Sequence, residues 1–190
     1  MLTSYIELGF EHILDVKGYD HILFVIVLCV AYKSTEWRKM LVLITAFTLG
    51  HTLTLGLSAS GLISINSILV ETLIPITILL SALLNIWEEV RGKLVALGVH
   101  YFLALAFGLI HGLGFSNFFK SLVSPGESIF PMLLSFNVGV ELGQIIVVLL
   151  TFLLIYVLVQ FFKIVRHSII NITVSALAGV ISILLLAGVL

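Results

Sequence analysis

The chain has 190 residues, of which 61% are hydrophobic and only 10% are charged, with a formal net charge of -1. Soluble domains carry roughly a quarter charged residues, so this composition excludes a water-soluble globular protein. The single cysteine, Cys29, excludes an internal disulfide and any thiolate-rich metal site. We therefore expect an integral membrane protein that contacts the lipid bilayer and no nucleic acid.

Residues 1–16 predict a short helix at the membrane interface. Leu2, Ile6 and Phe10 recur at helical spacing, and acidic residues occupy the positions between them. Because the segment contains no Lys or Arg, it lacks the basic start of a cleavable signal peptide. We expect an amphipathic helix that lies on the bilayer.

The remaining chain predicts membrane-spanning α-helices, because its apolar runs are continuous over about 20 residues and do not alternate as barrel strands do. A chain of this length has room for about six crossings. Charged ends and polar turns place these spans at about 19–32, 40–57, 68–87, 94–115, 129–162 and 169–190. The predicted fold is one all-α domain over residues 1–190, a bundle of six transmembrane helices.

Basic residues are distributed unevenly between the loops. Two fall on the side of the N-terminus, Lys17 and Lys120, and the other seven fall in the alternate loops, namely Lys33, Arg38, Lys39, Arg91, Lys93, Lys163 and Arg166. The positive-inside rule places the second group in the cytoplasm. The sequence thus predicts a multi-pass protein of the cytoplasmic (inner) membrane with both termini outside, periplasmic in a Gram-negative cell.

Ionisable side chains gather in the outer half of the predicted spans. His21 begins the first span, His51 lies roughly 20 Å from the cytoplasmic end of the second, and His111 lies within about one turn of the outer end of the fourth. Glu71 lies about one turn into the third span, and Glu141 two to three turns into the fifth. The same layer contains Asp20, Thr48, Asn137 and Gln144.

Charged groups that face a bundle interior commonly mark ion sites, and three imidazoles buried together are difficult to satisfy without a cation. We predict a metal site formed by Asp20, His21, His51, His111 and Glu141. Imidazole and carboxylate ligands suit Ni, Co, Zn, Cu or Fe rather than Mg or Ca. Residues that could complete or orient this set from a second layer are His12, Glu71, Asn137, Gln144 and Thr48. His100 and His167 lie outside the layer, and we interpret them as structural or solvated.

Four motifs follow in order along the first five spans: Gly18-x-Asp20-His21-Ile22-Leu23-Phe24, Thr45-Ala46-Phe47-Thr48-x-x-His51-Thr52-x-Thr54-Leu55, His111-Gly112-x-Gly114-Phe115 and Phe136-Asn137-x-Gly139-Val140-Glu141-x-Gly143-Gln144. Together they resemble the HupE/UreJ family. The resemblance implies a small membrane protein of about six spans and a nickel or cobalt permease activity. It also implies a metal role for Asp20, His21, His51, His111 and Glu141.

The chain departs from that family's nickel permeases at two places. They carry H-x5-D-H, whereas seven residues separate His12 from Asp20 here. They also carry F-H-G-x-x-H-G-x-E, of which this chain keeps only His111-Gly112 and the distant Glu141.

Two functions are compatible with such a layer of polar groups. A permease would bind a divalent metal from the outer side and pass it inward, although the cytoplasmic half offers no obvious second acidic site. A membrane-embedded metalloenzyme would instead use metal-activated water, or copper or iron redox chemistry, on a lipid or membrane substrate from the outer leaflet. In that case Glu141 or Glu71 would be the general base and Asn137 a polar stabiliser.

Overall fold

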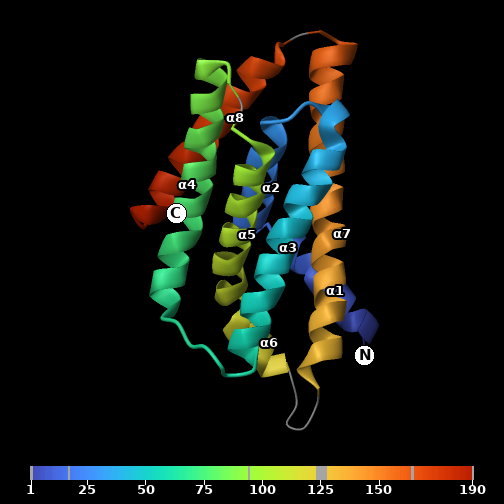
Figure 1. The fold of residues 1–190 in the computed structure, drawn as a ribbon, viewed down its shortest axis with the longest axis vertical. Coiled ribbons are helices and arrows are strands. Elements are labelled where there is room, and N and C mark those ends of the chain that lie inside the picture. The colour runs from blue at the N-terminus through green and yellow to red at the C-terminus, as the bar shows by residue number, and fades with distance from the viewer. Residues whose placement is uncertain (1, 17, 94, 123–127, 164, 190) are drawn as a thin grey trace.

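The structure is a computed structural model that describes residues 2–16, 18–93, 95–122, 128–163 and 165–189. Within these ranges the chain forms helices and turns and no β-strand, which confirms the all-α prediction. The α-helices are α1 (Leu2–Leu14), α2 (Asp20–Val30), α3 (Trp37–Ala59), α4 (Ser67–Arg91), α5 (Leu97–Gly114), α6 (Ser116–Leu122), α7 (Ile129–Tyr156) and α8 (His167–Leu186) (Figure 1). A 3-10 turn, η1 (Ser34–Glu36), precedes α3, and a π-helical stretch, η2 (Val157–Phe161), continues α7.

Among the described residues, five helices are long and apolar enough to cross a membrane: α3, α4, α5, α8, and α7 with its extension to Phe161. The chain is therefore a multi-pass membrane protein, as its composition predicts. α2 is also apolar but has only 11 residues. It rises about 16 Å, against roughly 30 Å of bilayer hydrocarbon. Six complete spans are thus not confirmed.

α1 packs against α7. Gly9 of α1 faces the Phe136 carbonyl and Gly139 of α7 faces the Ile6 carbonyl, each so closely that a Cβ atom would overlap the oxygen. Phe136 and Gly139 lie about 10 to 15 Å from the start of α7. The interfacial position predicted for residues 1–16 is not confirmed, because glycine contacts draw α1 to this depth along α7.

α3 and α5 approach each other along a second glycine seam. Gly108 faces the Phe47 carbonyl, and Gly112 faces the His51 carbonyl, again with no room for a Cβ atom. Small residues at a helix crossing let the two backbones come this close. The contact at Gly112 places His51 of α3 level with the neighbouring His111 of α5.

The helix ends gather at two ends of the molecule. One holds the ends of α2, α4 and α7 and the starts of α3, α5 and α8; the other holds the N-terminus, α6, the end of α3 and the starts of α4 and α7 (Figure 1). The first, here named the basic end, carries the seven basic residues of the predicted cytoplasmic loops, and the second is named the N-terminal end. Lys120 lies at the N-terminal end, and Lys17 lies outside the described residues.

Candidate metal centre

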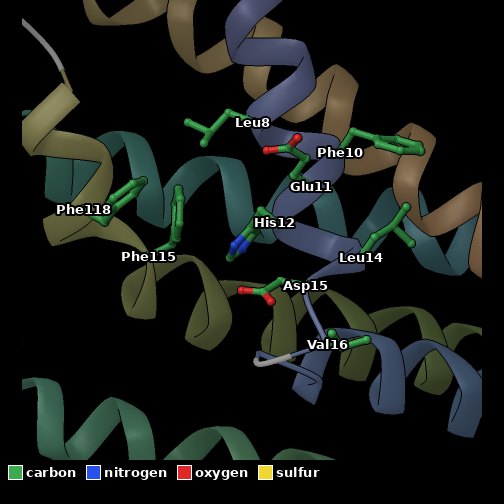
Figure 2. Close-up of a pocket in the computed structure, with 9 residues that line it drawn as sticks. All are labelled: Leu8, Phe10, Glu11, His12, Leu14, Asp15, Val16, Phe115 and Phe118. Atoms are coloured by element: carbon green, nitrogen blue, oxygen red, sulfur yellow. The ribbon is translucent and has the colours of Figure 1, made fainter.

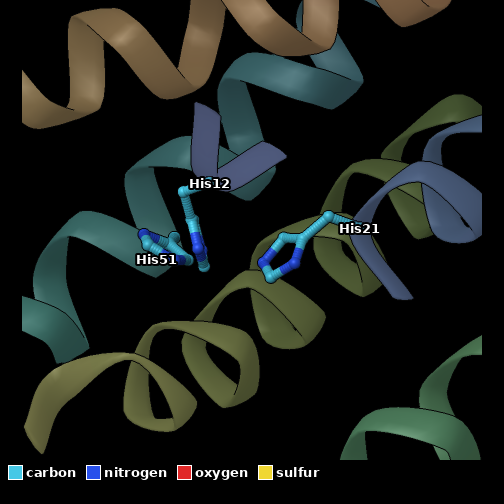
Figure 3. Close-up of side chains that lie close together, drawn as sticks. All are labelled: His12, His21 and His51. Atoms are coloured by element: carbon cyan, nitrogen blue, oxygen red, sulfur yellow. The ribbon is translucent and has the colours of Figure 1, made fainter. Parts of the chain in front are cut away.

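Three histidines from three helices converge inside the bundle. His12 of α1, His21 of α2 and His51 of α3 each offer a ring nitrogen, and these atoms lie within 4.8 Å of one another (Figure 3). The ring centroids of His12 and His21 are 4.6 Å apart, and those of His21 and His51 are 6.0 Å apart. His51 is completely buried, and His21 is 5% exposed. The break between α1 and α2 lets two consecutive segments face the same point.

A fourth histidine, His111 of α5, borders this group. Its ring centroid lies 5.1 Å from that of His21, and the side chain is 1% exposed. Its Nδ1 lies 2.9 Å from the Phe107 carbonyl oxygen one turn earlier on the helix. Because a carbonyl only accepts, Nδ1 donates to it and the lone pair is on Nε2.

Asp20 orients the ring of His21, as the Phe107 carbonyl orients that of His111. The Asp20 carboxylate accepts from the backbone N–H of His21 at 2.8 Å and from its Nδ1–H at 2.9 Å. These bonds fix the ring and assign the lone pair to Nε2. Metal-ligating histidines commonly donate their second nitrogen to a carboxylate or a carbonyl, and both arrangements occur here. Asp20 therefore holds the His21 imidazole through Nδ1, and Nε2 stays without a hydrogen-bond partner.

The four histidines carry buried ring nitrogens without a hydrogen-bond partner in the described part of the chain. Among the described residues, Nε2 of His12, His21, His51 and His111 and Nδ1 of His51 are buried and make no hydrogen bond. Buried polar groups are otherwise nearly always satisfied. For His21 and His111 these atoms are bare lone pairs, which repel each other unless a cation or a donor lies between them. The cluster thus fits a positive ion.

The donor chemistry narrows the kind of ion. Imidazole nitrogens bind a transition metal at about 2.0–2.1 Å, so two ligands of a tetrahedral set lie about 3.4 Å apart. Nitrogen atoms within 4.8 Å of one another reach that spacing by small side-chain rotations. Neutral nitrogen ligands suit Ni, Co, Zn, Cu or Fe rather than Mg or Ca.

A cavity of ≈ 610 Å³ leads to this cluster from the N-terminal end. Glu11, His12 and Asp15 of the α1 segment line it, opposite Phe115 and Phe118 (Figure 2). The ring centroids of His12 and Phe115 are 4.0 Å apart, so the imidazole of the cluster borders the same cavity as the two carboxylates. Carboxylates at a mouth of low dielectric raise the local concentration of cations.

Glu71 lines a separate cavity of ≈ 420 Å³ together with Gly18, Tyr19, Asp20 and Pro75. This cavity lies on the carboxylate side of the Asp20–His21 pair. Glu71 and Asp20 therefore line the same cavity.

Asn137 adjoins the cluster. Its side-chain N–H donates to the Leu133 carbonyl at 2.7 Å, while its Oδ1 is buried without a partner, and its amide lies close enough to His51 to interact with the ring. It is one of the predicted polar neighbours of the metal site.

Glu141 is not among the residues whose ligand atoms converge. It is half-buried and accepts a hydrogen bond from Thr45 Oγ1 at 2.5 Å, in the seam between α3 and α7. Thr48 Oγ1 donates to Gln144 Oε1 at 2.8 Å in the same seam. The structure thus groups Glu141, Thr48 and Gln144 as polar contacts between two helices, and the ligand atoms that converge belong to histidines.

A family model described as HupE / UreJ protein matches residues 1–187. The chain belongs to the HupE/UreJ family. The resemblance recognised in the sequence is confirmed by this match, which extends over essentially the whole chain. No match is found among curated proteins or among solved structures.

The member of the cluster that sequence reasoning ranked lowest is His12. The sequence placed it only among possible second-layer residues, because its spacing from Asp20 is irregular for the family. The signal that could have found it is the pairing of Gly9 with Gly139, because these glycines allow α1 to dock on α7. Docking places His12 beside His51, with 5.9 Å between ring centroids.

Proposed function

We propose that the protein is a permease for nickel- or cobalt-type divalent ions, and that His12, His21, His51 and His111 bind the ion in transit. The observation that supports this most directly is the convergence of buried imidazole nitrogens without partners. Membership of the HupE/UreJ family supports transport over other uses of the metal.

The proposal includes an orientation. The basic end faces the cytoplasm and both termini face outward, in an inner membrane, because positively charged loops are retained inside. The ion then enters through the cavity at Glu11, His12 and Asp15 and moves toward the basic end. Asp20 holds His21, and Glu71 adds negative charge behind it.

Ni²⁺ uptake into proteoliposomes that contain a trapped metal-sensitive dye tests the proposal. We expect the purified protein to admit Ni²⁺ and the His21→Ala and His51→Ala variants to lose this activity. His167→Gln is the matched control, because His167 lies at the basic end and hydrogen-bonds the Tyr32 carbonyl. Absence of flux from protein that keeps one tightly held, non-exchanging metal ion would contradict a permease and favour a metalloenzyme.

A further inference from the structure

A second polar group is buried at the basic end, where the sequence suggested no acidic site. The carboxylate of Glu88 lies 3.2 Å from Nε2 of His100, and these side chains are 2% and 6% exposed. The Tyr32 hydroxyl lies 3.0 Å from Nδ1 of His100. The three side chains come from α4, α5 and the segment after α2. We name Glu88, His100 and Tyr32 the inner group.

The inner group is in register with the histidine cluster. His100 and His111 are 11 residues apart on α5, and so are Tyr32 and His21 along the α2 segment. Eleven residues make about three helical turns, so each pair shares one helix face with a separation of about 16 Å. Both groups therefore lie along one interior column.

A layer of phenylalanines separates the two groups. Phe24, Phe47 and Phe107 lie three or four residues toward the basic end from His21, His51 and His111, respectively. All three are buried, and the Phe24 ring centroid lies 5.0 Å from that of Phe47 and 5.9 Å from that of Phe107. An apolar layer of this kind is a barrier to a hydrated divalent ion, since desolvating a charge without polar partners is costly.

Glu88 is not fully satisfied by its neighbours. One oxygen, Oε1, accepts from the Val95 backbone N–H at 2.7 Å, but Oε2 is buried without a partner. His100 Nε2 faces Glu88 at an angle that makes no hydrogen bond. If Glu88 and His100 served only to hold α4 against α5, we would expect Glu88 Oε2 and His100 Nε2 to have hydrogen-bond partners. An unpaired carboxylate oxygen beside an imidazole nitrogen offers ligands to a cation.

The inner group also has a route to the basic end. Glu88 lines a cavity of ≈ 350 Å³ between the ends of α2 and α4 and the start of α8. The cavity lining carries charges of both signs, because Lys33 and Lys93 line it together with Glu36 and Glu89.

We propose that Glu88 and His100 form a second, weaker station for the transported divalent ion, on the basic side of the phenylalanine layer. This inference rests on the proposed transport function and extends it: the ion leaves the histidine cluster, passes the layer and is received by a carboxylate and an imidazole. Two residues bind less tightly than four imidazoles, so the second station favours release.

The test compares Glu88→Gln and His100→Gln with Glu89→Gln. Glu89 lines the same cavity and accepts a hydrogen bond from Asn171, which Gln can preserve, so it controls for loss of charge and of packing. We expect the first two variants to bind Ni²⁺ at the histidine cluster with unchanged stoichiometry and affinity, and to lose about tenfold or more of the flux. Normal flux in both, with Ni²⁺ binding retained, would overturn the second station.

Absence of flux in the wild-type protein would refute the permease itself. The second station can still be tested in that case by measuring metal binding. In the His51→Ala background, Co²⁺ absorption should report a residual weak site that His100→Gln removes and Glu89→Gln does not. If His51→Ala binds no Co²⁺, or if His100→Gln leaves its Co²⁺ binding unchanged, the second station is overturned independently of transport.

Discussion

Replacing Gly139 by Ala tests whether the docking of α1 builds the metal centre. A Cβ atom at this position would overlap the Ile6 carbonyl oxygen and lie 2.8 Å from the Phe10 nitrogen. Ordinary contacts begin at about 3.4 Å, and the three nearest atoms all belong to the α1 backbone, so α1 itself must move away from α7. Overpacking of this kind costs about 1–3 kcal/mol.

The displacement acts on His12, which α1 carries into the cluster. If the ion draws α1 back against the new methyl group, the binding free energy loses the same 1–3 kcal/mol, which corresponds to a Kd about 5- to 150-fold higher. If α1 stays displaced, the ion keeps three imidazoles and also binds less tightly. Either way the affinity falls although Gly139 touches no ligand atom.

Calorimetric titration of the purified protein with Ni²⁺ measures the change. Gly98→Ala is the matched control, because this α5 glycine has open space around its Cβ position and should leave the Kd unchanged. An unchanged Kd in Gly139→Ala, or an equal loss in both variants, would refute the account of α1 as a ligand-bearing helix.

Three further predictions concern the neighbours of the cluster. Asp20→Ala frees the His21 ring and should weaken Ni²⁺ binding by about 10- to 100-fold in a titration, and wild-type affinity would contradict its orienting role. Gly112→Ala forces α3 and α5 apart at the His51 carbonyl and should lower the thermal midpoint by several degrees, as a cost of about 1–3 kcal/mol implies; a midpoint equal to the wild type would argue against the glycine seam. Glu141→Gln retains the bond from Thr45 and should leave the Ni²⁺ stoichiometry unchanged, whereas loss of bound metal would place Glu141 among the ligands.

The helices were the predictable part of the fold. Continuous apolar runs and charged loops place α4 and α8 within a few residues of the predicted spans, because such runs have no alternative in a bilayer. The interfacial position expected for α1 is not confirmed, and amphipathicity predicts which face is apolar but not which surface covers it. Here the cover is α7, through contacts between glycines that are far apart in the sequence.

The metal centre was partly predictable for a related reason. Depth along a helix follows from residue counts, so His51 and His111 were correctly expected at one level, and their closeness follows from the Gly112 contact. The rotation of each helix about its own axis does not follow from residue counts. Asn137 and Glu141 share a face by spacing, but the packing of α3 leaves Asn137 beside His51 and turns Glu141 toward Thr45.

The environment of His100 cannot be predicted from the sequence of its own helix. Alone on the cytoplasmic side of its span it has the pattern of a structural histidine. Its partner Glu88 lies at the end of the preceding helix, where a charged residue ordinarily marks a loop. Only the folded chain brings the two together.

The central claim is that the converging imidazoles bind one divalent ion. Co²⁺ absorption spectroscopy on the purified protein tests it directly, because the visible d–d bands report nitrogen ligands and their number. We expect one tightly bound Co²⁺ per chain, with a nitrogen-rich spectrum that His167→Gln leaves intact. In His51→Ala this tight site is lost and only the weak second station remains. Absence of Co²⁺ binding by the wild-type protein, or a spectrum unchanged by His51→Ala, would contradict the account.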